Sequence, residues 1–553
     1  MKVAFNHKRT FFLLSLFVIA FSVAWTNADL KSNETRYSGK YAKTSCESSS
    51  CRRHKAFKQQ RPHIAANSIW VHTGPDGKLV YKSTDRGDKI MDFSSAGFMG
   101  GGIAFPDPPV VITLAPVAGD NSMLIQQAID QVSSMKMING YRGTILLKPG
   151  VYDCSQTLKI EASGVVLRGS GSRPTGTIIN MTGGPHNGIS IKGNVRSQTV
   201  SDPVAITDHY VPSGTSAFSV SSAAGFKAGD SIRIVKPVTE SWIRFMGMDH
   251  LVRDGKNQTW ISGDIPVERT IKSISGNKIM VDIPLTDNYD ATYLDPAGTQ
   301  VVKVASVGEI SRIGIEELRI VAPAQSLTIN ESHHRAFSIS GSSDCWAKNI
   351  EIFNTVNSVS VTGRRITIDH VNITHEKPTI GAAKPADLNG SGPQILFNQC
   401  NISGDNLFFF ATGAKVSGPV VLLNCTFNGN GWVQPHQRWA TGVLIDNCHV
   451  PNGGIDFMNR GEMGSGHGWA IGWSVAWNCT ARSFLNQQPP GAANWVIGSV
   501  GEKQRKAMPF DSVPLLPEGI YDAHGTYVRP GSLYLAQLAE RLGTSAVKNI
   551  GYE

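Results

Sequence analysis

The stretches that decide the fold are VVLLNCTF (420–427) and GVLIDNCHV (442–450), two apolar runs that each contain Asn-Cys. Two further segments carry a cysteine in the same kind of context, so that the four residues are Cys400, Cys425, Cys448 and Cys479. They are 25, 23 and 31 residues apart. Short apolar runs are typical of buried strands, and in a β-solenoid equivalent side chains recur once per coil and stack inside. Cysteine packs there as a small hydrophobe, and asparagine tolerates the left-handed backbone of the adjacent bend. Unless the recurrence is chance, it predicts a parallel β-helix with all four thiols pointing inward.

Two helices and one insertion interrupt this pattern. NSMLIQQAIDQVSSM (121–135) has an apolar face, which predicts a helix that caps the first coil and protects its sheet edges. SLYLAQLAERLG (532–543) predicts a second amphipathic helix that closes the other end. Between them, FSVSSAAGFKAGDSIRIVKP and NKIMVDIPLT resemble antiparallel strands, so residues 196–305 are predicted to form an inserted β-rich subdomain.

Charge and composition divide the remainder of the chain. Residues 1–63 carry 12 Lys and Arg against 3 acids, whereas the other 490 residues carry 40 of each, so the formal charge of +9 belongs to the tail and does not indicate a nucleic-acid partner. Residues 1–28 have the basic start, apolar stretch and small-residue end of a secretory signal, which predicts a secreted protein without a membrane segment after cleavage. Residues 29–63 are expected to be a disordered basic linker. The first coils are expected in 64–195, the main β-helix in 306–500 and a C-terminal capping segment in 501–553.

The remaining cysteines and the sequons bear on processing. Cys46 and Cys51 fall in the linker, where a disulfide is favoured over zinc because the spacing matches no common zinc pattern. The other six cysteines are expected to be buried thiols. In a eukaryotic host, N-glycosylation is permitted at sequons that include Asn33, Asn180, Asn257, Asn330 and Asn389.

Several motifs support a family resemblance. The helix within VAGDNSMLIQQAI, followed by TILLKPGVY and VVLRGSG, resembles the N-terminal module of the pectate lyase superfamily, which includes pectate lyases and polygalacturonases. The resemblance covers about residues 110–195 and 302–500, and MDFSSAGFMGGG, PHQRWATG, NRGEMGSGHGW and PPGAANW are similar to a large subgroup without an assured substrate. It implies an all-β, right-handed parallel β-helix and a carbohydrate-active protein with an acidic polysaccharide as partner. For a lyase it also implies calcium as cofactor.

Basic residues on consecutive coils point to eliminative cleavage of a uronate. That reaction needs a cation or strong donors on the carboxylate and a base for the C5 hydrogen, and Arg, Lys or His serves as base when like charges lower its pKa. His436 and Arg438 follow Cys425 by 11 and 13 residues, and Arg460 follows Cys448 by 12. With the coils in register, Arg438 and Arg460 would stack about 4.8 Å apart and hold the carboxylate. His467 is expected to approach His436, and these four residues form the predicted catalytic set.

Further residues are predicted to bind the substrate. Six of the 11 tryptophans lie within residues 431–495, where exposed indoles would stack on sugar rings, and two or three of the six are expected to be buried. Trp439 and Trp469 are the members assigned to substrate binding. The insertion is expected to lean over the groove and to bring Trp242, Arg244 and His250 toward Arg438. Trp242 and His250 are therefore predicted contacts, and Asp405 is a predicted groove acid.

Two other functions remain open. Ser465-Gly466-His467-Gly468 matches an element of polygalacturonases, but the nearest match to their Gly-Asp-Asp is Gly404-Asp405-Asn406, which lacks the second carboxylate of an inverting hydrolase. The other alternative is a non-catalytic glycan-binding or adhesion solenoid. Because no cluster of three acids accompanies the arginines and calcium takes six to eight oxygens, a metal-independent site is predicted.

Overall fold

The computed structural model describes residues 66–506 and 515–553. The predicted signal, the linker, and Cys46 and Cys51 lie outside the described residues. Within the described ranges, no helix is long and apolar enough to cross a membrane.

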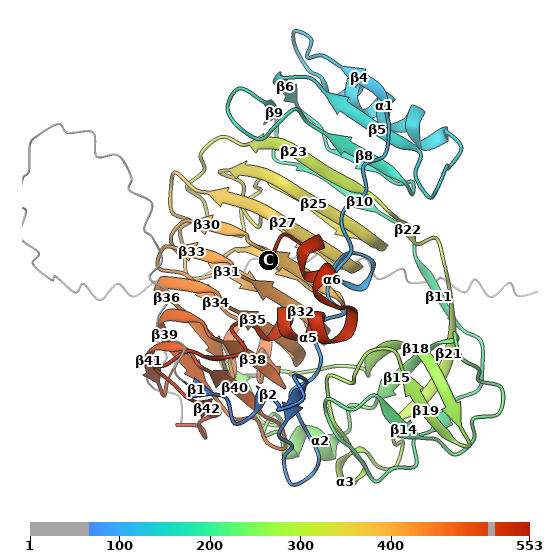
Figure 1. Cartoon of the computed structure of the whole chain (residues 1–553). Helices are drawn as coiled ribbons and strands as arrows, with labels where there is room; N and C mark the ends of the chain where they lie inside the picture. Colours follow the sequence, from blue (N-terminus) through green and yellow to red (C-terminus); the bar gives the residue numbers. More distant parts are fainter. Residues whose placement is uncertain (1–65, 507–514) are drawn as a thin grey trace, which may run out of the picture. The chain divides into compact units, whose positions relative to one another are not determined.

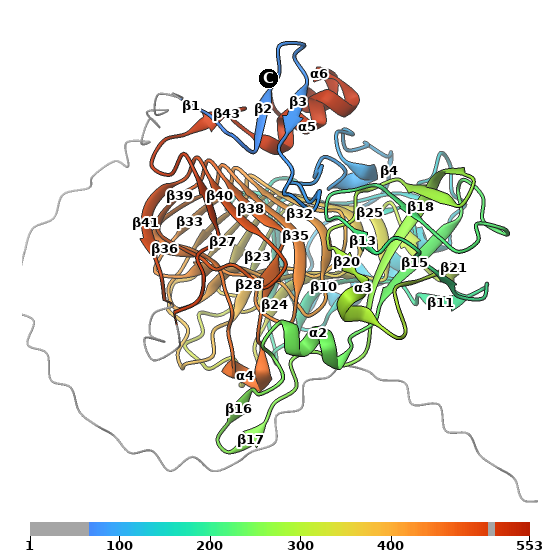
Figure 2. The same ribbon diagram turned by 90° about the horizontal axis from the view of Figure 1, so that it is seen from below.

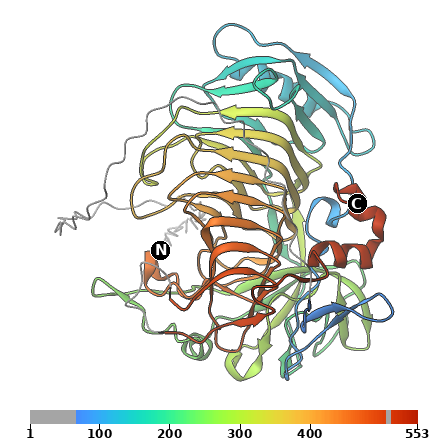
Figure 3. The same cartoon turned by 60° about the vertical axis from the view of Figure 1, so that its left-hand side comes forward.

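The described chain forms a parallel β-helix, as predicted, whose coils stack three sets of strands (Figures 1 and 3). Stack 1 contains β4 (Val110–Leu114), β5 (Gly143–Leu147), β8 (Val165–Arg168), β22 (Ile310–Ser311), β29 (Ile395–Asn398), β32 (Ser417–Leu423), β35 (Ala440–Asp446), β37 (Ile471–Gly472), β38 (Ser474–Trp477), β40 (Asn494–Ile497) and β42 (Ile520–Asp522). Stack 2 contains β6 (Gly150–Cys154), β9 (Thr177–Met181), β30 (Asn401–Ser403), β33 (Thr426–Asn428) and β41 (Val500–Gln504). Three long strands contribute to both of these stacks, namely β23 (Gly314–Val321), β25 (Ser342–Phe353) and β27 (Arg364–Thr374).

Stack 3 forms the remaining wall. It contains β7 (Leu158–Ile160), β10 (Asn187–Lys192), β24 (Arg335–Ser340), β26 (Val359–Val361), β28 (Ala386–Gly390), β31 (Phe408–Ala411) and β34 (Trp432–Val433). The strands β36 (His449–Phe457) and β39 (Thr480–Asn486) run from stack 2 into stack 3. The candidate functional site lies at the ends of these last stack 3 strands.

The cysteine ladder lies inside the coils. Cys400, Cys425, Cys448 and Cys479 are at most 1% exposed and belong to the main hydrophobic core, which confirms that all four point inward. All six cysteines of the described residues are free and buried. The residue before each ladder cysteine has a left-handed backbone, with φ of 52°, 51°, 54° and 49° at Gln399, Asn424, Asn447 and Asn478. Asparagine tolerates this conformation better than most residues, which accounts for the Asn-Cys repeat.

Helix α1 (Ser122–Ser134) caps the first coils, as predicted. Its residues Ile125, Ile129 and Val132 are buried in the same core as the strands of the first coils. The second helix is α5 (Leu533–Leu542), followed by α6 (Thr544–Asn549). It does not close the last coil as expected: it packs on the outer surface of stack 1, together with the hairpin of β2 (Val71–Thr73) and β3 (Leu79–Tyr81) (Figures 1 and 2). The outer surface of stack 1 is itself apolar, so it needs this cover.

The remaining N-terminal elements are short. Strand β1 (Ala66–Asn67) pairs in parallel with β43 (Val528–Arg529), and the 3-10 helix η1 (Phe98–Gly100) follows the β2–β3 hairpin. Phe98 of η1 packs on Trp346, with ring centroids 5.1 Å apart. This N-terminal segment is therefore held by β43 at its start and by the coils at η1.

The attachment of α5 depends on Asp446 at the end of β35. Its buried carboxylate accepts hydrogen bonds from Ser532 Oγ (2.7 Å) and from the backbone N–H of Tyr534 (2.8 Å). Burial raises the pKa of Asp446 to about 7. The neutral acid is therefore favoured in the folded state, whereas an unfolded Asp titrates near pH 3.9.

We expect Asp446 to make the protein less stable as the pH rises from about 4 to about 7. The folded state binds the proton more tightly than the unfolded state, so its stabilising contribution is complete below pH 4 and is lost as the pH passes the folded pKa. Asp446→Asn keeps an acceptor oxygen without a charge, and its melting temperature should fall less over this range than that of the wild type. Asp76→Asn, at an exposed position, should behave like the wild type. An unchanged pH dependence in Asp446→Asn would disprove the assignment.

The insertion forms an antiparallel sheet between β10 and β22. Its strand order is β11 (Arg196–Thr199), β21 (Gln300–Val307), β15 (Ser231–Lys236), β18 (Ile265–Ser275), β19 (Lys278–Val281) and β14 (Ala217–Ser219), with β12 (Val204–Ala205) also paired to β21. Smaller elements are β13 (Tyr210–Val211) with β20 (Tyr289–Asp290), the hairpin β16 (Val252–Arg253) and β17 (Lys256–Asn257), and the helices α2 (Glu240–Phe245) and α3 (Ala291–Leu294). The sheet thus spans the residues that the turn and strand pattern assigned to a subdomain.

A buried ion pair joins the insertion to the β-helix. Lys236 Nζ lies 2.7 Å from Asp287 Oδ2, and both side chains are 3% exposed. The same carboxylate accepts hydrogen bonds from the indole N–H groups of Trp439 (2.8 Å) and Trp473 (3.1 Å), which belong to the coils. Lys236 Nζ also lies 4.5 Å from the ring centroid of Trp242. One carboxylate therefore connects both parts of the chain.

Candidate functional site

The candidate site is formed where the chain leaves β36. Residues 459–469, which include the short helix α4 (Met463–Gly466), form a loop whose ends meet in an antiparallel bridge between Asn459 and Trp469. Arg460 N–H donates to Gly468 O at 2.7 Å and closes the loop. The N–H of Arg438 donates to His467 O at 3.0 Å, so the loop lies on the preceding coil. This arrangement positions Arg460 and His467 above residues 434–438.

Arg460 lies at the centre of the polar cluster. Its Nη1 donates to Gln434 Oε1 and lies 3.2 Å from His436 Nδ1. Its guanidinium also lies 5.5 Å from the ring centroid of Phe408. Because the guanidinium can only donate, His436 Nδ1 accepts, and this neutral imidazole carries its hydrogen on Nε2.

The two histidines meet as predicted. The rings of His436 and His467 lie 4.8 Å apart, and His436 packs edge-on against Phe408 at 4.9 Å. Burial, followed by the positive charge of Arg460, lowers the pKa of His436 well below its usual value. The same causes lower the pKa of His467 to about 3. Both imidazoles are therefore neutral at pH 7 and can accept a proton only at a ring nitrogen without hydrogen.

Arg438 is not stacked on Arg460, contrary to the prediction. Its Nε donates to Trp260 O (2.6 Å), and its Nη2 donates to the backbone oxygen (2.7 Å) and Oγ (2.8 Å) of Ser465. The left-handed backbone at Arg438 and Trp439, with φ of 51° and 64°, turns the chain toward β35 at this position. Arg438 therefore fastens the insertion and the loop together, whereas Arg460 faces His436.

Asp456 and Gln434 support the cluster from below. These residues occupy neighbouring coils, and Gln434 Nε2 donates to Asp456 Oδ2 at 2.8 Å. Burial raises the pKa of Asp456 to about 6, although the Gln434 amide and the charge of Arg460 act in the opposite direction. Burial lowers the pKa of Arg460 to about 10, partly offset by Asp456.

The cluster has more positive charge than its carboxylates balance. Within residues 66–506 and 515–553, neither Arg438 nor Arg460 forms an ion pair within 4.0 Å. Three buried polar atoms also lack a hydrogen-bond partner there: Arg460 Nε, His467 Nδ1 and Asp456 Oδ1. Unpaired buried polar groups are costly, so these atoms indicate a place where water or a ligand binds. The unpaired N–H donor of Arg460 Nε and the positive charge that no carboxylate balances favour an anionic ligand.

The insertion covers this cluster, and of its three predicted residues Trp242 does approach Arg438, since its ring centroid lies 6.0 Å from that of Trp439, whereas the other contacts are made by residues that were not predicted. Trp260 Nε1 donates to Trp469 O (3.2 Å), and Arg253 of the β16–β17 hairpin donates to Gly464 O (3.0 Å). Figure 2 shows this hairpin beside α4. His250 and Arg244 are 79% and 70% exposed, and their carboxylate neighbours are Asp249 and Glu240 of the insertion itself. Neither residue is among those that hold the insertion near Arg438.

The tryptophan prediction was wrong for most members. Trp439 and Trp469 are 2% and 1% exposed, so they present no face to a sugar. Trp242 is 5% exposed and stacks on Trp260 with ring centroids 5.0 Å apart. Of the six tryptophans in residues 431–495, five are buried, rather than two or three, because the insertion and the N-terminal segment pack over the coils.

Trp432 is the member of this set that is not buried. It lies on stack 3 in register with Phe408 and Gly454, and Lys384 Nζ lies 5.4 Å from its ring centroid. A Cβ at Gly454 would come within 2.9 Å of the Trp432 ring and 3.2 Å of Asp456 Oδ1. Glycine therefore leaves room between the indole and the unpaired carboxylate oxygen.

Asp405 lies apart from the arginine and histidine groups. It is exposed in the turn between stack 2 and stack 3, where its Oδ1 accepts from the N–H of Asn430 (2.9 Å). Its neighbour Asn406 contacts Lys384, which in turn approaches Trp432. Asp405 thus lies near the Trp432 end of stack 3, and the residues named above for the Arg460 cluster do not include it.

Sequence reasoning missed Gln434, Asp456, Phe408 and Trp260. Gln434 and Asp456 carried a usable signal, because each is a polar residue next to apolar strand residues and the two are 22 residues apart, close to the coil spacing of 23 between Cys425 and Cys448. Trp260 had no such signal, because its contact joins residues more than 170 positions apart. No group of three or more His, Cys, Asp or Glu that could hold a metal is found among the described residues.

Comparisons with known proteins give remote similarities only. No protein family and no curated protein matches the chain. Similar solved structures include the tailspike protein gp49 from Pseudomonas phage LKA1, with 15% identity, 69% of each chain covered and a TM-score of 0.37. Another is the Gp54 tailspike of Acinetobacter baumannii bacteriophage AP22 in complex with capsular saccharide, with 11% identity, 73% of this chain and 71% of that chain covered, and a TM-score of 0.25. A tailspike mutant of E. coli bacteriophage HK620 in complex with a pentasaccharide has 11% identity, covers 71% of this chain and 55% of that chain, and has a TM-score of 0.38.

Proposed function

We propose that this protein binds an acidic polysaccharide at the Arg460 cluster and cleaves it by β-elimination. The observation that carries the proposal is the set of unpaired groups: two guanidiniums without a carboxylate partner lie around two neutral imidazoles. A uronate carboxylate supplies the missing negative charge and the missing acceptor for Arg460 Nε. The resemblance to the pectate lyase superfamily agrees with this substrate class, and the expected secretory signal agrees with action outside the cell.

The roles follow from which nitrogen atoms are free. His436 Nδ1 already accepts from Arg460, so His436 orients the guanidinium. His467 Nδ1 has no partner and is the proposed base. It removes the C5 proton, the electron pair forms the C4=C5 double bond, the C4–O4 bond breaks, and O4 takes a proton from water. The bound carboxylate also raises the low pKa of His467 toward the value that proton abstraction requires, because opposite charges favour the imidazolium.

Calcium does not fit the described residues of this cluster. Calcium takes six to eight oxygen ligands, and Asp456 is the carboxylate that adjoins Arg460, which itself carries positive charge. We therefore assign the stabilisation of the C5 carbanion to Arg460 and derive no step through a metal.

A screen against acidic polysaccharides tests the function. The purified protein is incubated with uronate polymers, and both the ultraviolet absorbance of unsaturated uronates and the reducing ends are measured. We expect both signals from at least one polymer, with activity that persists below pH 6.5 because the pKa of His467 in the free protein is low. Reducing ends without ultraviolet absorbance would establish a hydrolase instead, and tight binding without cleavage would establish a glycan-binding protein.

A further inference from the structure

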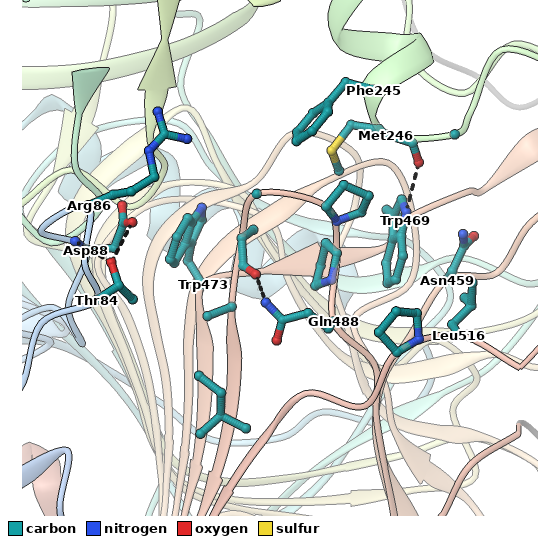
Figure 4. Close-up of a pocket in the computed structure, with 18 of the residues that line it drawn as sticks. Thr84, Arg86, Asp88, Phe245, Met246, Asn459, Trp469, Trp473, Gln488 and Leu516 are labelled. Atoms are coloured by element: carbon teal, nitrogen blue, oxygen red, sulfur yellow. Dashed lines mark hydrogen bonds between the residues drawn. The ribbon is translucent and has the colours of Figure 1, made fainter. Parts of the chain in front are cut away.

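A cavity shares a wall with the Arg460 loop. It has a volume of about 660 Å³ and is lined by Asn459 and Trp469 of that loop, by the C-terminal end of α2, by residues 84–88 and by residues 488–493 (Figure 4). This volume lies within the range of small-molecule sites. None of the residues assigned above to proton transfer or carboxylate binding lines it.

The charged groups of the cavity are matched, unlike those of the Arg460 cluster. Arg86 pairs with Asp290 at 2.7 Å and stacks on the Tyr210 ring at 3.6 Å. Asp88 accepts from Tyr210 Oη (2.7 Å) and Thr84 Oγ1 (3.0 Å). Asp85, also in the lining, is an exposed acid. With its single cation paired and acids in excess, this lining does not favour a carboxylate ligand.

The walls are apolar and aromatic, with two polar atoms left free. Figure 4 shows Phe245 and Met246 on one side and Trp469 and Trp473 on the coils, and Pro489 and Pro490 complete this surface. Asn459 Oδ1 accepts from Gly461 N–H, and Gln488 Nε2 donates to Ala492 O. Within the described chain, Asn459 Nδ2 therefore remains as a donor and Gln488 Oε1 as an acceptor.

We propose that this cavity binds a neutral sugar residue. The C–H face of a pyranose packs on the half-buried rings of Phe245 and Pro490, while its hydroxyl groups both donate and accept, as the free atoms of Gln488 and Asn459 require. A planar hydrophobic ligand would leave these two atoms unpaired. Arg460 is the residue next to Asn459, so we assign this neutral sugar to the same polymer whose uronate binds Arg460. Only this assignment to one polymer rests on the proposed function.

Binding of neutral glycosides tests the proposal independently of cleavage. Methyl glucoside, methyl galactoside and methyl rhamnoside are titrated against the full chain, and binding is followed by tryptophan fluorescence and by saturation-transfer NMR. Asn459→Asp keeps the acceptor for Gly461 and removes the donor, and Gln488→Leu removes the acceptor. Asn194→Asp is the matched control at an exposed position. Arg460→Gln disables the proposed catalytic site but leaves the cavity unchanged.

We expect saturable binding of at least one glycoside to the wild type, to Arg460→Gln and to Asn194→Asp. Asn459→Asp and Gln488→Leu should each bind about tenfold more weakly, which is the effect of one lost hydrogen bond. If the protein binds glycosides with this pattern but cleaves no uronate polymer, then the cavity assignment stands and the proposed function is wrong. The proposal is overturned if no glycoside binds saturably, if both variants bind like the wild type, or if phenol competes more strongly than every sugar.

Discussion

Arg460→Gln should lower the rate of uronate elimination by about 100-fold or more. The guanidinium of Arg460 contacts His436, whose ring lies beside that of the proposed base His467. A preorganised charge-stabilising group contributes at least this factor to the rate. Glutamine keeps a donor but removes the positive charge that acidifies the C5 hydrogen. We expect the fold to persist, because Arg460 forms no ion pair among the described residues that the substitution would break.

The control is Arg482→Gln, which makes the same substitution at an exposed position of β39. Its rate and melting temperature should match those of the wild type. His467→Ala should lose activity to a similar extent as Arg460→Gln, whereas Arg438→Ala should lower the melting temperature as well, because Arg438 holds Trp260 and Ser465. Elimination at the wild-type rate in Arg460→Gln would disprove the assigned site. Loss of activity in Asp405→Ala alone would move the chemistry to the turn near Trp432.

Asp287→Ala should be the most destabilising of the substitutions considered. It leaves the Lys236 ammonium buried without a partner and removes the acceptor of the Trp439 and Trp473 indoles. Removing one member of a buried ion pair typically costs about 3–5 kcal/mol. The loss should concentrate at the junction of the insertion and the coils, so hydrogen exchange should accelerate in β15 and β18 before it does so in the coil strands.

The matched control for this prediction is Glu268→Ala. Glu268 pairs with Arg233 in the same sheet at 2.7 Å, but its side chain is 52% exposed. A solvent-exposed pair contributes about 0–1 kcal/mol, so this variant should unfold close to the wild-type temperature. If Asp287→Ala is no less stable than Glu268→Ala, then the ion pair does not secure the insertion.

The features predicted correctly from sequence are those that repeat or follow a local period. The cysteine spacing predicted the coil register, and the apolar face of α1 predicted the helix that caps the first coils. Both patterns could be read from the sequence because each recurs at a regular spacing along the chain. The proximity of His436 and His467 followed from that register. The position of α5 did not, since its apolar face fits the outer surface of stack 1 as well as it would fit an open coil end.

The tryptophans and Arg438 show why the site was only partly predictable. An indole in a loop is exposed or buried according to what packs over it, and here Trp242 and Trp260 from the insertion cover Trp439. Arg438 and Arg460 occupy comparable positions in their coils, but a positive φ at Arg438 and the 459–469 loop direct the two side chains to different partners. Neither effect is encoded in residue spacing.

The position of the insertion has a consequence for how the protein is made. Strand β10 pairs with β24, and β8 pairs with β23, so the early coils are completed by strands that follow the whole insertion in the chain. At a synthesis rate of about 5–20 residues per second, a nascent chain waits on the order of ten seconds between these partners. During that interval the edge strands β8, β9 and β10 have no neighbour on one side and can pair with other chains. The insertion thus sets the period during which the growing polypeptide is open to misassembly, and shortening it should raise the yield of folded protein at high expression rates.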